Sequence, residues 1–161
     1  MEQHELIVLV GPSNSGKSTW AWNNIQDKNS VVSTDDIREV LTGDAGDQSA
    51  NRSVFEILEI IVRERMLHKQ TTVVDATNLD RRGRVDLRAT AVGCDAGYRE
   101  VAFPVAVEVA LVRNRKRAAD GGLDVPAHII ERHVAKMNNY METIRAGVDY
   151  PVEVISNEEC D

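Results

Sequence analysis

The sequence has few cysteines and no long apolar stretch, and both absences narrow the class of protein. Its two cysteines, Cys94 and Cys160, lie far apart, so they form neither a disulfide framework nor a metal-ligand spacing. No apolar run approaches the roughly 18 residues that a membrane span needs. The acidic, polar segment 1–5 is unlike a signal peptide. We therefore predict a single domain over residues 1–161, in a reducing cytoplasmic setting and without membrane association.

The histidines form no pair at i,i+4 spacing, so the sequence predicts no histidine metal site. No Ser-His-Asp arrangement and no nucleophilic cysteine is indicated either. We expect each histidine to be an ordinary surface or core residue. They are His4, His68, His128 and His133.

The chain also lacks an overall excess of positive charge. Its net charge is -7 and its isoelectric point about 5.1, whereas a protein that follows many phosphates is usually basic. The acidic net charge argues against extended nucleic-acid binding, but it is compatible with binding of only one end of a nucleic-acid chain. The positive charge that is present is gathered in two groups, Arg81, Arg82, Arg84 and Arg88, and Arg113, Arg115, Lys116 and Arg117.

Short apolar strands alternate with amphipathic helices along the chain. The predicted strands are 6–10, 30–33, 71–74, 98–103 and 152–155, and the predicted helices are 17–26, 53–69, 82–92, 105–119 and 126–141. This alternation predicts an α/β fold of the P-loop NTPase type, with a parallel sheet of about five strands and helices on both faces. A small helical lid is expected at about 113–126. Ligands of such folds bind at the carboxyl ends of the strands.

Residues 11–18 carry the spacing G-x-x-x-x-G-K-S, directly after a strand and at the start of a helix. Successive backbone N–H groups of such a loop point at phosphate oxygens, and the helix N-terminus adds a partial positive charge. Lys17 would reach the β- and γ-phosphates of ATP, and the Ser18 hydroxyl would bind Mg²⁺. The predicted nucleotide contacts are Gly11, Ser13, Asn14, Ser15, Gly16, Lys17, Ser18 and Thr19.

Asp35 and Arg38 follow the second strand and lie three residues apart, so they share a face at the start of a helix. A kinase that acts on a hydroxyl needs a carboxylate to take its proton, and an arginine binds a phosphate with both ends of its fork. Helix capping by Thr34 or Asp35 is the alternative explanation.

Asp75 ends the third apolar strand and is followed by Thr77 and Asn78. An aspartate in this position resembles a Walker B residue, which holds or orients Mg²⁺ and its waters. A strand-end turn explains the same residues equally well, because Asp, Thr and Asn are all common in turns.

Arg113 and Arg117 lie four residues apart on one face of a predicted helix that leads to Gly121 and Gly122. An arginine stabilises the charge of a migrating phosphoryl group, and a segment with glycines behind it suits a lid. The alternative is a solvated basic face that favours the helix C-terminus.

Taken together, these motifs resemble the polynucleotide 5′-hydroxyl kinase family, and most of all the kinase module of bacterial RNA-repair proteins. The landmarks, within about 6–155, are G-P-S-N-S-G-K-S-T, V-V-S-T-D-D-I-R, G-D-Q-S, T-V-V-D-A-T-N, R-N-R-K-R and V-P-A-H-I-I. The resemblance implies that Asp35 is the general base and that Arg38 contacts the 3′-phosphate of the acceptor. It further implies acceptor contacts by Gln48, Thr77 and Asn78, donor clamping by Arg113 and Arg117, and metal binding by Ser18 and Asp75.

The sequence departs from the family in two ways. Segment 118–124 has no arginine where bacterial modules can carry a further basic lid residue, and no D-x-D-x-T phosphatase motif is present. We therefore expect a kinase of 5′-OH ends of RNA or DNA without the companion 3′-end activity. A P-loop kinase for a small-molecule hydroxyl and a nucleotide-dependent switch are the alternatives. The sequence leaves open a homodimer and a separate phosphatase or ligase partner.

Overall fold

The computed structural model describes residues 3–156 of the chain, so Cys160 lies outside the described residues. The strands are β1 (Glu5–Val10), β2 (Val31–Ser33), β3 (Thr72–Asp75), β4 (Gly97–Ala102) and β5 (Val152–Val154). The α-helices are α1 (Lys17–Asn24), α2 (Thr34–Thr42), α3 (Asn51–Leu67), α4 (Arg81–Gly93), α5 (Val107–Ala119) and α6 (Ala127–Ala146). Two 3-10 turns, η1 (Lys28–Ser30) and η2 (Gln48–Ala50), precede β2 and α3.

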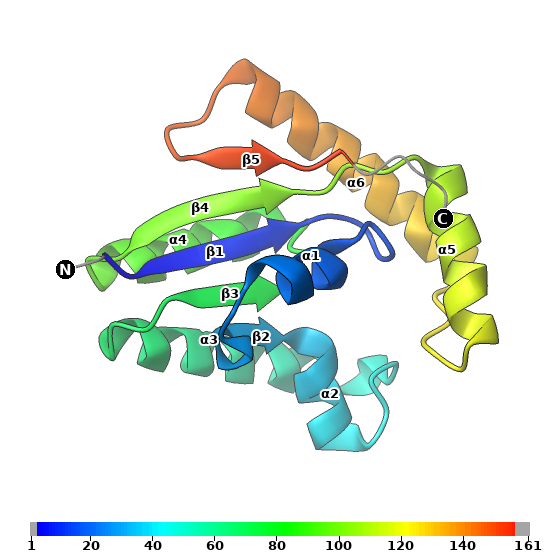
Figure 1. The fold of residues 1–161 in the computed structure, drawn as a ribbon, viewed down its shortest axis with the longest axis horizontal. Helices are drawn as coiled ribbons and strands as arrows, with labels where there is room; N and C mark the ends of the chain where they lie inside the picture. The colour runs from blue at the N-terminus through cyan, green and yellow to red at the C-terminus, as the bar shows by residue number, and fades with distance from the viewer. Residues whose placement is uncertain (1–2, 157–161) are drawn as a thin grey trace.

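The five strands form one parallel sheet in the order β2-β3-β1-β4-β5, and this confirms the predicted α/β fold (Figure 1). The order is not the order along the chain, because β1 is inserted between β3 and β4 in the middle of the sheet. All strands end at the same edge, so the loops that follow β1, β2 and β3 meet there.

Strand β1 divides its side chains between two cores, because successive residues of a strand point to opposite faces. Leu6, Val8 and Val10 pack into the core beneath α3, α4 and α6. Ile7 and Leu9 pack into a smaller core beneath α1. Helices therefore cover both faces of the sheet, and the loop after β1 lies at the centre of its carboxyl edge (Figure 1).

Some element ends differ from the predictions. Helix α6 continues to Ala146 instead of stopping near 141, because Met141 and Ile144 still pack against the larger core. Helix α2 is capped by Ser33, whose side chain accepts a hydrogen bond from the amide of Asp36. The capping explanation for Thr34 or Asp35 is therefore wrong. Within the described part of the chain, no helix combines the length and the apolar character needed to cross a bilayer.

Candidate active site

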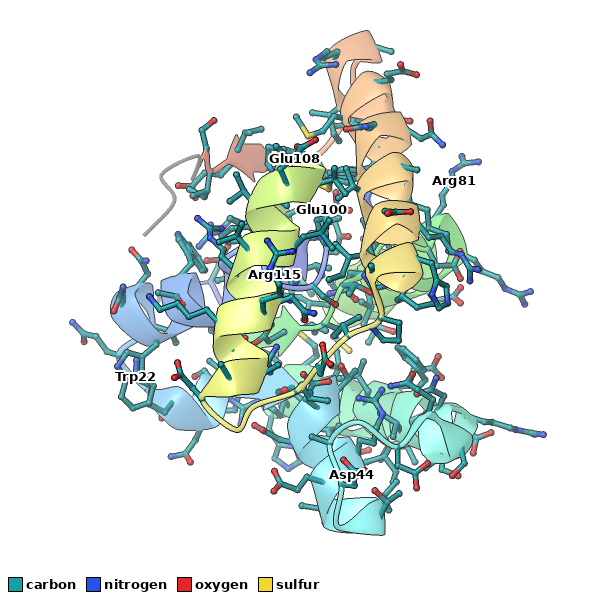
Figure 2. The ribbon with its side chains drawn as sticks, turned by 90° about the vertical axis from the view of Figure 1, so that its right-hand side faces the viewer. Trp22, Asp44, Arg81, Glu100, Glu108 and Arg115 are labelled. Atoms are coloured by element: carbon teal, nitrogen blue, oxygen red, sulfur yellow. The ribbon has the colours of Figure 1, made fainter. Side chains whose placement is uncertain are left out.

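The carboxyl edge of the sheet gathers the predicted site residues, and Figure 2 looks onto this edge, with α5 in front. The loop after β1 and the loop after β3 are joined directly, because the amide of Gly11 donates to the carbonyl oxygen of Thr77 at 3.0 Å. The loop after β2 opens α2 beside them. The structure thus brings three of the four predicted motifs together at the ends of three neighbouring strands.

Residues 11–18 form a tight loop that only small or permissive residues can make. A side chain on Gly11 would meet Ser15 Oγ at 2.6 Å and the carbonyl oxygen of Phe103 at 3.0 Å. Asn14 and Gly16 adopt positive φ angles of 63° and 97°. Helix α1 then begins without a capping side chain and without an acidic residue in its first turn. Its N-terminus is therefore suited to an anion, because its first N–H groups need acceptors.

Lys17 lies buried inside this loop. Its ammonium group donates to the carbonyl oxygens of Gly11 and Pro12, at 2.9 and 2.7 Å. Burial lowers the pKa of Lys17 to about 8, opposed by the carboxylates of Asp75 and Asp35 and reinforced by the guanidinium of Arg117. Carboxylate and guanidinium groups from three other segments therefore lie close enough to affect the lysine charge.

Ser18 and Asp75 form the pair that the sequence predicts as a metal site. The Ser18 hydroxyl donates to Asp75 Oδ2 at 2.7 Å, although the two residues are 57 positions apart. Burial raises the pKa of the Asp75 carboxyl, while Ser18 and Lys17 lower it. Mg²⁺ prefers hard oxygen ligands and is commonly held by one or two carboxylates together with substrate phosphates. The donor set therefore fits Mg²⁺, and metal binding by Ser18 and Asp75 stays a prediction.

The Asp35–Arg38 pair lies at the start of α2. Arg38 Nη1 donates to Asp35 Oδ1 at 2.8 Å, and Arg38 Nη2 donates to Asn51 Oδ1 at 2.9 Å. Asn51 in turn donates to Gln48 Oε1 at 2.8 Å. Arg38 is buried, and among the described residues its Nε has no hydrogen-bond partner. Asp35, Arg38 and Gln48 thus belong to one connected network, as their predicted shared role requires.

Asn78 stabilises the loop after β3 from within. Its amide nitrogen donates to the carbonyl oxygen of Leu9 at 2.7 Å, and its own backbone has a positive φ of 49°. Its carbonyl oxygen accepts a hydrogen bond from Arg84 at 2.9 Å. Because this amide is engaged by the main chain, an acceptor contact by Asn78 stays a prediction, as it does for Thr77.

The lid arginines occupy different environments. Arg113 Nη1 donates to the carbonyl oxygen of Asn14 at 3.3 Å, which links α5 to the phosphate loop. Arg117 is exposed, and its side chain lies against Gly122, where a Cβ atom would meet its Cγ at 2.8 Å. Arg115 is exposed as well (Figure 2). The influence of Arg117 on the pKa of Lys17 places it on the side of the phosphate loop.

Asn114 is a site residue that the sequence reasoning missed. It is buried, with 5% of its surface exposed, although basic residues surround it in sequence. Its side-chain oxygen accepts from the amides of Asn14 and Val125, at 3.1 and 3.0 Å, and its nitrogen donates to Asp124 and to the carbonyl of Val125. Asn114 therefore ties the phosphate loop, α5 and the segment before α6 together. An asparagine inside the R-N-x-x-R motif was the available signal.

His133 was expected to be an ordinary residue, yet it contacts the phosphate loop. Its Nδ1 lies 3.3 Å from Ser13 Oγ and 3.5 Å from the Ser13 amide. Burial, together with the nearby charges of Lys17 and Lys136, lowers the pKa of His133 to about 4, so the ring is neutral at physiological pH. A search for metal-ligand spacings could not find it, because its partner is 120 residues away.

The fold and the residues at this edge define a P-loop protein of kinase-type architecture. It combines a parallel sheet, a phosphate loop, the nearby carboxylates of Asp35 and Asp75, and arginines on α5. The family described as "AAA domain" matches residues 6–144, and the chain belongs to that family.

Known proteins with similar chains are kinases and an RNA-repair protein. A chain in the structure of the Pnkp1/Rnl/Hen1 RNA repair complex matches with a TM-score of 0.77 and 27% identity, over 89% of this chain and 47% of that chain. The L-seryl-tRNA(Sec) kinase of Methanococcus maripaludis is 28% identical over 141 residues, or 83% of this chain and 52% of the relative. The likeness to the RNA-repair kinase module that the motifs predict is thereby confirmed at the level of the fold.

A gluconokinase from Sinorhizobium meliloti shares the fold alone, with a TM-score of 0.61 and 18% identity over 97% of this chain and 84% of that chain. The chain spans about half the length of the RNA-repair chain and of the tRNA kinase. These matches do not fix the acceptor, which has to be argued from the site.

Proposed function

We propose that the protein is an ATP-dependent polynucleotide kinase that transfers the γ-phosphate of ATP to 5′-OH ends of RNA or DNA. The observation that carries this proposal is the position of Asp35. Asp35 and Asp36 both help to raise the pKa of Asp75, but only the Asp35 carboxylate also lies close enough to Lys17 to oppose the fall of its pKa, so Asp35 is the one directed toward the phosphate loop from α2. A nucleotide switch has no need of a carboxylate in this position, whereas a hydroxyl kinase does.

On the donor side, the loop at 11–18 and the N-terminus of α1 hold the β- and γ-phosphates. The Lys17 ammonium exchanges its carbonyl partners for phosphate oxygens, which raises its pKa and keeps it protonated. Ser18 and Asp75 hold Mg²⁺, which when bound neutralises charge on the β- and γ-phosphates. Thr19 and Ser15 complete the loop around the same phosphates.

On the acceptor side, the oxygen of the 5′-hydroxyl bonds to the γ-phosphorus. Asp35 accepts the proton that this hydroxyl loses. The bond from the γ-phosphorus to the β,γ-bridging oxygen breaks, and ADP leaves with that electron pair. Arg38 holds the Asp35 carboxylate in place through its 2.8 Å hydrogen bond. The same guanidinium offers a fork to the acceptor's 3′-phosphate, with Gln48 beside it.

The lid completes the site from α5. Arg113 already contacts the phosphate loop and clamps the donor, and Arg117 moves against the γ-phosphate when the segment at about 113–126 closes. Charge builds on the γ-phosphoryl group in the transition state, so Arg117 contributes more to the transition state than to ground-state binding.

One relative supports a polynucleotide acceptor, and the second supports only a kinase whose acceptor hydroxyl is carried by an RNA. The structural relative stands in an RNA repair complex, and the curated relative is named as a kinase of a seryl group on tRNA. Both have identities above those of the sugar kinase, whose match concerns the fold only. We propose by the same reasoning that the protein works with separate repair proteins, such as a ligase or a phosphatase.

A panel of acceptors tests the proposal. The purified protein is incubated with γ-labelled ATP, Mg²⁺ and either a 5′-OH oligonucleotide, a nucleoside 3′-phosphate, the plain nucleoside, gluconate or seryl-tRNA. We expect label on the oligonucleotide and on the nucleoside 3′-phosphate, and far less on the nucleoside, because the Arg38 fork needs a phosphate. Label on gluconate or seryl-tRNA instead, or on none of the five despite ATP binding, would contradict the proposal.

A further inference from the structure

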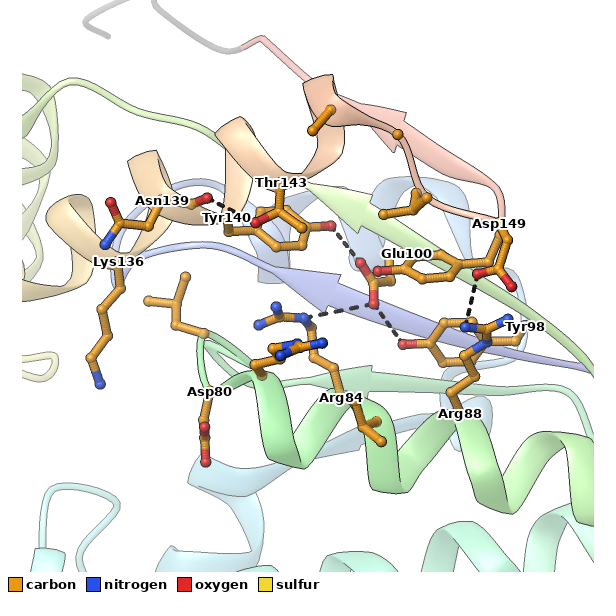
Figure 3. Close-up of a pocket in the computed structure, with 17 residues that line it drawn as sticks. Asp80, Arg84, Arg88, Tyr98, Glu100, Lys136, Asn139, Tyr140, Thr143 and Asp149 are labelled. Carbon is orange, nitrogen blue, oxygen red and sulfur yellow. Dashed lines mark hydrogen bonds and ion pairs between the residues drawn. The ribbon is translucent and has the colours of Figure 1, made fainter.

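A second cleft, of about 910 Å³, runs along the face of the sheet between α4 and α6. Leu79 and Asp80, directly after β3, line one end, and Asp149 and Tyr150, directly before β5, line the other. It therefore extends from the carboxyl edge of the sheet, where the candidate active site lies, to the opposite edge. Figure 3 shows Asp80 and Lys136 at one end of it and the Arg88–Asp149 pair at the other.

The floor of this cleft is a closed hydrogen-bonding unit around Glu100, which is 1% exposed. The hydroxyls of Tyr98 and Tyr140 donate to its two carboxylate oxygens at 2.7 and 2.6 Å, and Arg84 Nε lies 3.7 Å from Oε1. The Glu100 charge is thus compensated inside the protein. A negatively charged ligand above this floor would not meet an open carboxylate.

The walls carry cations stacked on aromatic rings. The guanidinium carbon of Arg84 lies 4.6 Å from the centre of the Tyr140 ring, and that of Arg88 lies 4.8 Å from the centre of the Tyr150 ring. Arg88 is also paired with Asp149 at 3.0 Å. The Arg84–Tyr140 pair is buried and stiffens the floor of the cleft, whereas Arg88 and Tyr150 are half-buried and leave a flat, partly accessible surface at its other end.

Two further cations, Arg81 on α4 and Lys136 on α6, line the same cleft and are exposed. Within the described range 3–156 neither of them forms an ion pair, in contrast to Arg84 and Arg88. Figure 2 shows Arg81 beside α6. The first basic group of the sequence therefore supplies three lining residues, of which Arg81 keeps its charge available for a ligand.

We propose that this cleft binds the nucleotides of a single-stranded acceptor that follow its 5′ end. The inference rests on the proposed kinase function and assigns a site beyond the reacting nucleotide. Single strands are bound by cationic grooves that follow the phosphates and by planar side chains on which bases stack. Arg81 and Lys136 supply the first feature, and the partly exposed Arg88–Tyr150 pair supplies the second.

The cleft begins where the candidate active site ends. Arg84 Nη1 donates to the carbonyl of Asn78, in the loop whose Thr77 carbonyl receives the Gly11 amide. On α6, Lys136 stands one helical turn after His133, which contacts Ser13 of the phosphate loop. A strand that leaves the site can therefore enter the cleft between Arg81 and Lys136. The net charge of the whole chain is -7, so the surface outside the cleft would on balance repel the strand.

A matched pair of double variants tests the proposal. Arg81→Ala with Lys136→Ala removes both exposed cations of the cleft. Arg82→Ala with Arg145→Ala removes the same charge from exposed residues on the same two helices that do not line the cleft. Binding of fluorescein-labelled oligoadenylate is measured by anisotropy at several salt concentrations. Phosphorylation is then compared between long oligoadenylate and adenosine 3′-phosphate.

We expect the cleft variant to bind oligoadenylate about five- to tenfold more weakly at low salt. Its log–log salt slope should be shallower by about 1.4, since each phosphate contact of a single strand contributes about 0.7. The advantage of the long acceptor over adenosine 3′-phosphate should shrink by a similar factor. The control variant should match the wild type in all three measurements.

Three results would overturn the proposal: equal losses in both variants, an unchanged salt slope in the cleft variant, or an undiminished advantage of the long acceptor. Failure of the kinase function itself looks different. In that case no variant, and no wild-type protein, would phosphorylate either acceptor, while the binding measurements would still report on the cleft.

Discussion

The phosphate loop and the lid hold their cations in opposite ways. Lys17 is buried and donates to two carbonyl oxygens of its own loop. Arg117 is exposed, and in the described part of the chain its side chain forms no hydrogen bond or ion pair. Preorganised charges cost no reorganisation during reaction, whereas a charge on a mobile lid acts only after closure. From this comparison we propose that the backbone of the phosphate loop is preformed, that Lys17 has only to exchange its carbonyl partners for phosphate oxygens, and that the lid determines when the site is complete.

The division of the apolar residues into separate clusters agrees with this difference between the phosphate loop and the lid. Val105, Ala110 and Ile130 form a small apolar cluster between α5 and α6 that is separate from the two cores of the sheet. Helix α5 and the first turn of α6 therefore pack mainly on each other and not on the sheet. Asn114 connects this unit to the phosphate loop, as do Arg113 and His133.

The largest effect is expected at the preformed cation. Lys17→Ala should reduce phosphoryl transfer about a thousandfold or more, because the β- and γ-phosphates lose their main cationic partner. Thr19→Ala, two residues later on α1, serves as a mild comparison. Single-turnover transfer from ATP to a 5′-OH oligonucleotide measures both. Near-normal transfer by the Lys17 variant would mean that the loop does not hold the donor.

The next largest effect is expected at the lid cation. Arg117→Ala should lower kcat roughly a hundredfold or more and change the KM for ATP much less, because the guanidinium acts on the transition state. Arg117→Lys should restore part of the rate, since it keeps the charge and loses the planar fork. Arg115→Ala is the control, because Arg115 is exposed on another face of α5. A lower kcat in the Arg115 variant, with no change in the Arg117 variant, would mean that the other face of α5 is directed toward the γ-phosphate.

A smaller effect is expected at the hydrogen bond that connects the phosphate loop with helix α5. Asn14→Ala and Asn114→Ala each break the 3.1 Å hydrogen bond between the phosphate loop and α5. If this bond couples the lid to ATP binding, a double-mutant cycle on the binding free energy of ATP should show a coupling of about 0.5–1.5 kcal/mol. Isothermal titration of ATP with the four proteins gives the cycle. Strictly additive losses of ATP binding free energy would show that this bond does not couple the lid to the phosphate loop.

The smallest effect concerns pH. The pKa of Lys17 is lowered to about 8 in the free protein, and bound phosphates raise it. Above pH 8 the free lysine loses its proton and has to regain it on binding. The affinity for ATP should therefore fall as the pH rises through about 8, by up to about tenfold per pH unit. A flat affinity profile from pH 7 to pH 9 would show that Lys17 keeps its proton in the free protein.

The sequence predicted the sheet and most of the site because both leave local signals. A buried parallel strand is a continuous apolar run, and the loop after β1 has a fixed spacing of glycines, lysine and serine. The pairing of Ser18 with Asp75 followed from the rule that parallel strands end at one edge. These predictions needed no knowledge of side-chain contacts.

The residues that were missed depend on long-range contacts. His133 reaches Ser13 across 120 residues, and Asn114 reaches Asn14 across 100, so neither shows in any local pattern. The cleft between α4 and α6 likewise needs residues from three helical and strand segments that only the fold brings together. The cap of α2 was misassigned for a smaller reason, because Ser33, Thr34 and Asp35 are all good capping residues in a row.

The most direct test of the account is the chemical role of Asp35, with its neighbour Asp36 as control. Both lie in the first turn of α2, but only Asp35 is paired with Arg38 and close to Lys17. Asp35→Asn keeps the shape and removes the basicity, so single-turnover transfer to a 5′-OH oligonucleotide should fall about 10²–10⁴-fold, with ATP affinity retained. Asp36→Asn should behave like the wild type. The account would be contradicted by rapid transfer in the Asp35 variant at saturating ATP, or by equal losses in the two variants.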